Sequence, residues 1–177
     1  MRISGGRLRG REVRVPRLGQ VRPTSARVRE ALFSIVGQEL DGWRTLDAFA
    51  GAGLLGLEAA SRGAGPVLFT DRDPAVVRHL RRTVAALVPA LADGVVLEVR
   101  RLDAAAALRR EGGFDLVLLD PPYAEDPVHW LSLAAPATRR VLALEHRWGC
   151  TLPPTAASLR LHRHRRYGDT GLAVYTA

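Results

Sequence analysis

Lysine is absent from this chain of 177 residues, cysteine occurs once, and no long apolar run is present. The single cysteine, Cys150, excludes a disulfide within the chain and a metal site built from several cysteines. No run approaches the roughly 18 apolar residues that a transmembrane helix needs, and Met1–Gly6 are not followed by the apolar core of a signal peptide. We therefore expect a cytoplasmic protein that has no membrane segment and needs no metal.

The composition is that of a folded domain. It is 47% hydrophobic and 25% charged, which suits a chain that fills a core of its own. The length predicts one domain with a small extension. We place a basic extension at residues 1–40 and the main domain at residues 41–177.

The basic residues, all of them arginine, are concentrated at the two ends of the chain. Residues 1–44 contain ten arginines and four acidic residues, and residues 158–177 contain four arginines and one acidic residue. Residues 45–157 are nearly neutral, with twelve arginines and thirteen acidic residues. Clustered arginine is the usual footprint of nucleic-acid binding, so we expect both ends to contact a nucleic acid. The absence of lysine itself is equally explained by GC-rich coding or by a preference for forked donors on phosphate.

Strand and helix patterns alternate between Thr45 and Leu144, which predicts a parallel sheet with helices on both faces. The tail changes character and predicts an antiparallel hairpin. The expected strands are 46–50, 67–70, 95–99, 114–119 and 141–144, with the hairpin at 159–164 and 172–175. The expected helices are 54–62, 74–87, 104–110 and 127–134.

The extension combines a small hairpin, residues 1–17, with a helix that Thr24 or Ser25 caps. Val28, Leu32 and Ile35 form the apolar stripe of that helix, and its arginines lie off the stripe. We expect the following residues to contact the nucleic acid: Arg7, Arg9, Arg11, Arg22, Thr24, Arg27 and Arg29 in the extension, and Arg163, Arg165 and Arg166 in the tail.

A glycine-rich turn, residues 47–56, follows the first expected strand of the main domain and opens a helix. It contains the spacing GxGxxG, which lets a backbone approach a ligand and exposes the N–H groups of a helix start. This context predicts a nucleoside-type cofactor, with a plain packing turn as the alternative. Asp71, at the end of the next strand, suits the ribose hydroxyls. We expect Asp73 to cap the helix that follows it. Asp103 can cap the next helix, accept a hydrogen bond from the adenine amine of the cofactor, or do both.

The stretch Asp120-Pro121-Pro122-Tyr123 ends a buried strand abruptly, because proline removes backbone donors and fixes φ. NAD(P) and S-adenosylmethionine both fit the glycine-rich turn. The Asp120–Tyr123 turn favours S-adenosylmethionine. The Asp120 carboxylate and the Pro121 carbonyl form an acceptor pair for an exocyclic base amine, and Tyr123 provides a ring for stacking on the base. The expected chemistry is therefore methyl transfer to a base amine.

Four stretches together resemble one family across nearly the whole chain: Arg22–Phe33, Leu46–Gly63, Asp120–Tyr123 and Tyr167–Leu172. The chain is similar to the small-subunit ribosomal RNA guanine-N2 methyltransferases of the RsmD type, which belong to the S-adenosylmethionine-dependent, Rossmann-like class. The resemblance implies a seven-stranded, mostly parallel α/β sheet with an antiparallel C-terminal hairpin. It also implies methylation of one guanine amine in 16S rRNA, within the small ribosomal subunit or an assembly intermediate.

By the same resemblance, Asp120, Pro121, Pro122 and Tyr123 hold the target base. The residues expected at the cofactor are Asp47, Phe49, Ala50, Gly51, Gly53, Asp71, Arg72, Asp103 and Ala104. Three rivals stay open at this point. They are an amino-methyltransferase that acts on DNA adenine or cytosine or on protein glutamine, an NAD(P)-dependent oxidoreductase, and an RNA-binding protein without activity.

Overall fold

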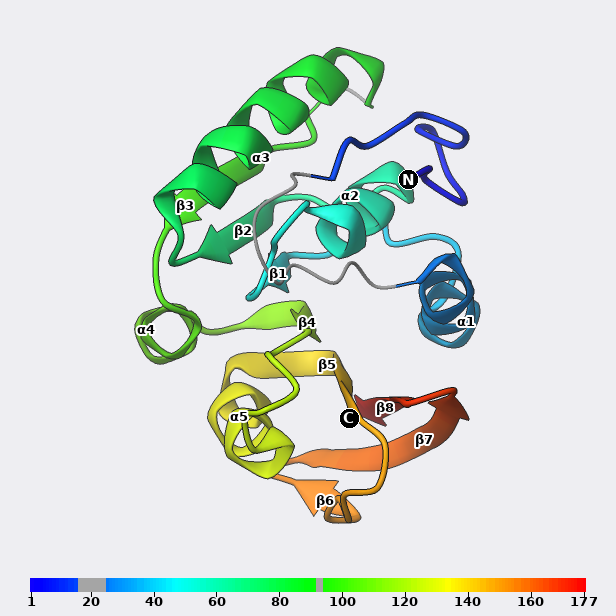
Figure 1. Cartoon of the computed structure of the whole chain (residues 1–177), viewed down its shortest axis with the longest axis vertical. Helices are drawn as coiled ribbons and strands as arrows, with labels where there is room; N and C mark the ends of the chain where they lie inside the picture. The colour runs from blue at the N-terminus through cyan, green and yellow to red at the C-terminus, as the bar shows by residue number, and fades with distance from the viewer. Residues whose placement is uncertain (16–24, 92–93) are drawn as a thin grey trace.

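A computed structural model describes residues 1–15, 25–91 and 94–177, and its strands form one mixed sheet (Figure 1). Within these residues the order of the eight strands is β3-β2-β1-β4-β5-β8-β7-β6. Strands β1 to β5 pair with one another in parallel. The strands β8, β7 and β6 extend the sheet beyond β5 by antiparallel pairing. The strands are β1 (Thr45–Asp47), β2 (Val67–Asp71), β3 (Leu97–Arg101), β4 (Phe114–Leu119), β5 (Thr138–Arg147), β6 (Thr155–Ala156), β7 (Leu159–Tyr167) and β8 (Thr170–Thr176).

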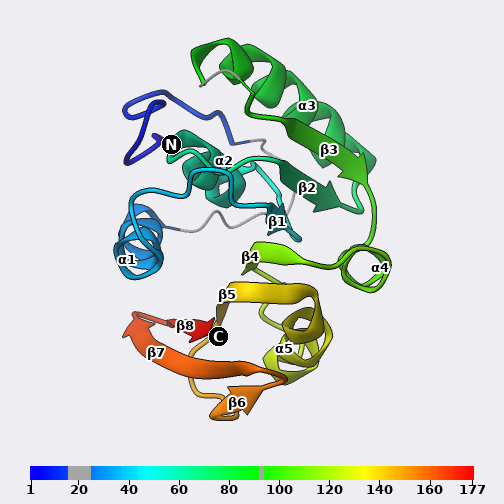
Figure 2. The same ribbon diagram turned by 180° about the vertical axis from the view of Figure 1, so that it is seen from behind.

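Helices cover both faces of the sheet, as the views from front and back show (Figures 1 and 2). One face packs against α1, α2 and α3, and the other packs against α4 and α5. In the described part of the chain no helix is long and apolar enough to cross a membrane. The helices are α1 (Ala26–Val36), α2 (Leu54–Ser61), α3 (Pro74–Leu87), α4 (Ala104–Arg110) and α5 (Pro127–Ala134), with short 3₁₀ turns at Val88–Ala90 and Ala135–Ala137.

The predicted fold class is confirmed, but several strands differ from their predicted bounds. β1 ends at Asp47, three residues before its predicted end, and β5 begins at Thr138, three residues before its predicted start. β7 and β8 are both longer than predicted. The sheet has an eighth strand because Thr155–Ala156 pairs with the start of β7. β3 begins at Leu97, two residues later than expected, and the apolar Val96 before it is 58% exposed. β5 extends to Arg147 because β8 pairs with it along seven register positions. Apolar runs do not reveal such edge and cross-strand pairing.

The predicted helix caps are confirmed where the structure describes them. Ser25 Oγ accepts from the backbone N of Val28 at 3.3 Å, and Thr24 lies outside the described residues. An Asp73 carboxylate oxygen accepts from the backbone N of Ala75 at 2.6 Å, and Asp103 does the same for Ala105 at 2.9 Å. Three of the four helices predicted for the main domain have the expected bounds, and α2 ends one residue early, at Ser61.

The N-terminal arm, residues 1–15, packs into the same core as the main domain. Its predicted hairpin is reduced to one isolated bridge between Arg2 and Glu12. Ile3, Leu8 and Val13 are almost fully buried against α1 and α2. The described core contains residues from both sides of the predicted boundary at residue 40. The division into an extension and a main domain therefore stays a prediction.

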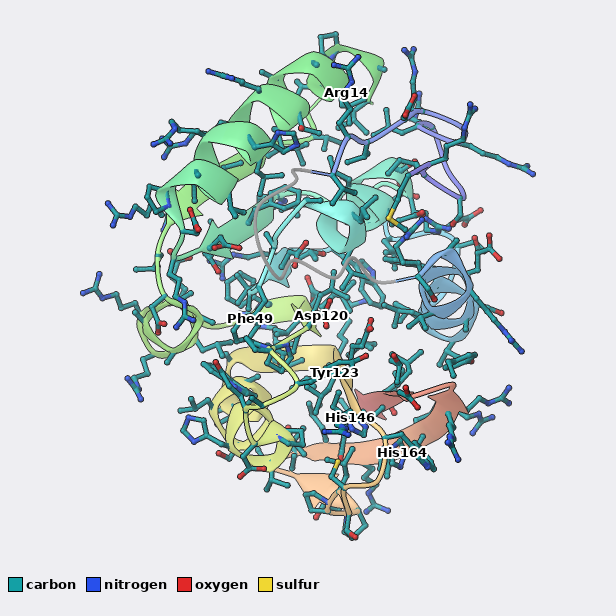
Figure 3. The ribbon with its side chains drawn as sticks, viewed as in Figure 1. Arg14, Phe49, Asp120, Tyr123, His146 and His164 are labelled. Atoms are coloured by element: carbon teal, nitrogen blue, oxygen red, sulfur yellow. The ribbon has the colours of Figure 1, made fainter. Side chains whose placement is uncertain are left out.

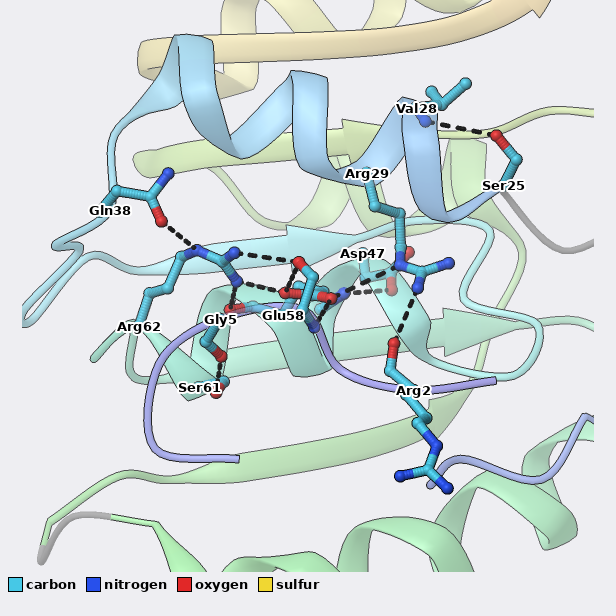
Figure 4. A network of polar contacts seen from close by, with 12 residues as sticks. Arg2, Gly5, Ser25, Val28, Arg29, Gln38, Asp47, Glu58, Ser61 and Arg62 are labelled. Carbon is cyan, nitrogen blue, oxygen red and sulfur yellow. Dashed lines mark hydrogen bonds and ion pairs between the residues drawn. The ribbon is translucent and has the colours of Figure 1, made fainter. Parts of the chain in front are cut away.

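A buried ion network joins the arm, α1 and α2 (Figure 4). Glu58 on α2 has no exposed surface, and its carboxylate pairs with Arg62 and, at 3.5 Å, with Arg29 of α1. The same carboxylate accepts from the backbone N of Ser4 at 2.6 Å and from Ser4 Oγ at 3.0 Å. Arg29 in turn donates to the backbone oxygen of Arg2 at 2.9 Å. One carboxylate therefore connects three segments.

We expect Glu58→Ala to lower the free energy of unfolding by about 3–5 kcal/mol, because it leaves two buried guanidinium groups without their carboxylate. Urea unfolding followed by circular dichroism measures the change. Glu98→Ala is the matched control, since Glu98 is paired with Arg100 but both side chains are about half exposed, and its loss should cost less than about 1 kcal/mol. Equal effects of the two substitutions would contradict the structural role of Glu58.

Candidate functional site

A cavity of about 900 Å³ lies at the carboxyl ends of the parallel strands. The chain runs outward from β1 through β2 to β3 on one side and from β4 to β5 on the other. The point where strand order reverses is the usual ligand position in open α/β sheets. All four residues predicted to hold the base line this cavity, as do eight of the predicted cofactor residues: Asp47, Phe49, Ala50, Gly51, Asp71, Arg72, Asp103 and Ala104.

Gly53 is the one predicted cofactor residue that does not line the cavity, and packing explains why glycine is needed there. Its φ of 78° is left-handed, and a Cβ would lie 2.4 Å from a methyl group of Leu80. Similarly, a Cβ on Gly56 would lie 2.3 Å from the ring of Phe69. Gly51, with φ of 51°, is the glycine of the motif that faces the cavity. The motif therefore combines one ligand-facing position with two packing positions.

Asp71 is fixed at the cavity by two backbone donors. Its carboxylate oxygens accept from the N of Gly51 at 3.1 Å and from the N of Asp73 at 2.9 Å. The bond to Gly51 joins the glycine turn to the end of β2, so the two predicted cofactor segments keep a fixed relative position. Asp103 lines the next part of the wall while capping α4, and its adenine role stays a prediction.

Asp47 is a buried carboxyl group at the end of β1. It is 2% exposed, and its Oδ2 accepts from the N of Gly56 at 2.9 Å. Burial raises the pKa of Asp47 to about 7, and repulsion from Asp120 and Asp71 acts in the same direction, although the Gly56 hydrogen bond opposes it. The floor of the cavity therefore holds a carboxylate at a cost to the stability of the fold.

The Asp120–Tyr123 turn leaves β4 at the cavity wall, and Figure 3 shows Asp120 and Tyr123 between β4 and the C-terminal strands. A hydrogen bond between the backbone N of Glu125 and the oxygen of Pro122, 2.9 Å long, closes the turn. The Tyr123 hydroxyl is hydrogen-bonded to the Thr170 hydroxyl at the start of β8. The ring predicted to stack on a base is thus held at its far end.

Sequence reasoning missed several residues that line the cavity: Ser25, Trp130, Glu145, Tyr167 and Thr170. Glu145 is 7% exposed and follows Leu144, which pairs in register with Leu119 just before Asp120. A polar residue directly after an expected buried strand was the available signal for it. Tyr167 and Thr170 belong to the stretch Tyr167–Leu172 that resembles the family, but their place at the cavity was not predicted, because it depends on the antiparallel pairing of the tail.

The arginines predicted to contact nucleic acid fall into three groups. Exposed positions are Arg7, Arg9, Arg11, Arg27, Arg163, Arg165 and Arg166. Arg22 and Thr24 lie outside the described residues. The prediction for Arg29 is wrong: its side chain has no exposed surface, because α1 turns this residue toward the Glu58 carboxylate and the arm. The roles of the exposed arginines stay predictions.

Replacing Asp47 by asparagine should stabilise the protein increasingly as pH rises. Because the pKa of Asp47 is raised from 3.8 to about 7, the folded protein loses stability as pH rises between these two values, where the unfolded chain ionises first. Asparagine does not ionise, so the variant has no such loss. At about 1.4 kcal/mol per pKa unit, the gain reaches a few kcal/mol and levels off above pH 7. Thermal melts of both proteins from pH 4 to 8 measure the difference. Glu39→Gln, at an exposed position, should give a flat difference, and a flat difference for Asp47→Asn would contradict the assignment.

Comparisons with known proteins agree with this architecture. Residues 1–176 match the family described as Conserved hypothetical protein 95. The chain is 35% identical to YlbH of Bacillus subtilis, over 99% of this chain and 98% of YlbH. It is 32% identical to Ribosomal RNA small subunit methyltransferase D of Escherichia coli K12, over 99% of this chain and 89% of that protein. The solved structure of yhhF from Escherichia coli has a TM-score of 0.84 at 31% identity, covering 99% of this chain and 97% of that one. The chain belongs to the Conserved hypothetical protein 95 family, which is the RsmD family that the sequence predicted.

Proposed function

We propose that this protein transfers a methyl group from S-adenosylmethionine to the exocyclic N2 amine of one guanine in 16S rRNA. The curated relatives from Escherichia coli and other bacteria that are named as small-subunit rRNA methyltransferases support the substrate class. We further propose that the guanine is presented in the small ribosomal subunit or in an assembly intermediate, in the cytoplasm.

The charge of the cavity is the observation that carries the choice of cofactor. Among the described residues that line it, seven are carboxylic acids and one, Arg72, is basic. A cavity of this charge favours a cation and disfavours the pyrophosphate of NAD(P). S-adenosylmethionine carries a positive sulfonium and an amino group, and it supplies an electrophilic methyl group when bound. The alternative of an oxidoreductase is therefore disfavoured by electrostatics as well as by family.

We propose a position for each part of the cofactor along the wall of the cavity. Asp71 accepts the two ribose hydroxyls, because its carboxylate is already oriented by Gly51 and Asp73. Asp103 lies one strand further along and accepts from the adenine amine. Asp47 and the Gly51 turn lie on the methionine side, where the acidic floor faces the amino group and the sulfonium.

The target base lies against the Asp120–Tyr123 turn. The Asp120 carboxylate and the Pro121 carbonyl accept the two hydrogens of the guanine amine, which keeps the nitrogen lone pair directed at the methyl group. The amine loses one proton on methylation, and we propose that Asp120 or water receives it. Tyr123 stacks on the base while its hydroxyl stays bonded to Thr170. A guanine reaches this cavity only when it is unpaired or flipped from its helix.

We expect the wild-type protein to bind S-adenosylmethionine and not NADH in calorimetric titrations. Asp71→Ala should weaken S-adenosylmethionine binding about 10- to 100-fold, since a charged acceptor of two hydroxyls is lost. Asp169→Ala is the control, because that exposed aspartate lies outside the cavity lining, and it should bind normally. Binding of NADH alone would contradict methyl transfer.

Asp120→Ala should abolish turnover while leaving the affinity for S-adenosylmethionine within about threefold of wild type, because this carboxylate contacts the base and not the cofactor. The assay measures labelled methyl groups transferred to small subunits, naked rRNA and duplex DNA, followed by mapping of the modified nucleotide. Methylated DNA with unmodified rRNA would favour another amino-methyltransferase over the proposed activity. Turnover by Asp120→Ala would contradict the role given to this residue.

A further inference from the structure

Trp148 is a large aromatic side chain on a charged surface that the proposed site does not use. It follows directly after β5 and is 37% exposed. Among the described residues, the other exposed large apolar side chains are valines: Val88, Val96 and Val128. Tryptophan is enriched at interfaces, because its ring is apolar while its N–H can form a hydrogen bond.

The His164 ring contacts Trp148, and the buried His146 ring contacts His164 in turn. His146 is 2% exposed and its Nε2 lies 3.0 Å from Nε2 of His164, and Figure 3 shows the two together on β5 and β7. The ring centroids of His146 and His164 are 5.1 Å apart, and those of His164 and Trp148 are 4.9 Å apart. Burial lowers the pKa of both histidines, which suits a neutral hydrogen-bonded pair. The indole therefore rests on a preorganised row of rings.

The surface around Trp148 is basic. The Arg166 guanidinium carbon lies 6.0 Å from the centre of the Trp148 ring. Arg147 precedes the tryptophan, and Arg163 and Arg165 lie along β7, all of them exposed. An aromatic ring among arginines is the combination that binds single-stranded nucleic acid, because the ring stacks on a base while the arginines contact the phosphates.

Trp148 is also tied to the cavity through one turn of the chain. Its backbone N donates to the oxygen of Asp169 at 2.8 Å. Asp169 lies between Tyr167 and Thr170, which both line the cavity. Trp148 therefore lies beside a turn whose flanking residues line the cavity.

We propose that Trp148 is a stacking site for an unpaired nucleobase of the RNA substrate, close in sequence to the methylated guanine. This inference rests on the proposed function, since it takes RNA as the ligand. Arg166 and the exposed arginines of β7 bind the adjoining phosphates. The indole thereby fixes the path of the strand after it leaves the cavity.

The test measures binding of a short single-stranded RNA oligonucleotide and of an RNA duplex of the same length by fluorescence anisotropy. Base–aromatic stacking contributes about 1–3 kcal/mol per base by alanine substitution, so Trp148→Ala should bind the single strand roughly 5- to 150-fold more weakly. Trp148→Leu should resemble the alanine variant, and Trp148→Phe should stay near wild type because it keeps a ring. Affinity for the duplex, whose bases are already stacked, should be unchanged in all three.

Salt dependence separates stacking from charge. Arg163→Gln should reduce the slope of log affinity against log salt concentration by about one, whereas Trp148→Ala should leave the slope unchanged. Wild-type S-adenosylmethionine affinity and melting temperature in the Trp148 variants establish that they are folded. If Trp148→Ala or Trp148→Leu unfolds, the binding of Trp148→Phe is measured with a series of oligonucleotides, each lacking the base at one position. A stacking site then appears as a loss of affinity when one particular base is missing.

Two outcomes overturn the inference in distinguishable ways. If Trp148→Ala binds the single strand as tightly as wild type while wild type methylates rRNA, the stacking site is wrong and the proposed function stands. This result would also be expected if Trp148 contacts a protein instead of RNA. If wild type neither binds the single strand nor methylates rRNA, the proposed function and the stacking site fall together.

Discussion

The structure depends on the parallel pairing of β1 with both β2 and β4. β1 is only three residues long, yet its neighbours bring Asp71 and Asp120 to the same edge of the sheet as Asp47. Because the chain direction is common to the three strands, the polar residue that ends each one enters the same cavity. Sheet topology, rather than any single motif, thus concentrates negative charge where a cationic cofactor is proposed to bind.

This concentration of carboxylates opposes folding, and buried contacts elsewhere compensate for it. The protein holds Asp47 in an environment that favours its neutral form, a cost that is common at functional sites. On the other side of α2, Glu58 is fully paired with arginines and with the backbone of the arm. The same short helix thus has a destabilising carboxyl group hydrogen-bonded near its start, through Gly56, and a stabilising one along its length.

The sequence was sufficient for the parallel half of the fold and for the residues that end its strands. Short apolar runs, proline and aspartate at helix starts, and glycine turns are local signals, and they predicted α3, α4 and α5 with their bounds. Pairing between distant segments leaves no local signal. The prediction that Arg29 contacts nucleic acid was wrong because its partner Glu58 lies 29 residues away in the sequence. For the same reason the sequence did not predict β6 or the positions of Tyr167 and Thr170 at the cavity.

Strand order has a consequence for how the cavity is assembled. β7 precedes β8 in the chain, but β8 lies between β7 and β5 in the sheet. β7 therefore connects to β5 through its hairpin partner β8, and β6 pairs with the other edge of β7. These pairings bring Tyr167 and Thr170 to the cavity, give Tyr123 its hydroxyl partner, and place His164 against His146. The wall proposed to hold the base and the surface around Trp148 thus depend on the same strand pairings, and loss of the β5–β8 pairing would remove both.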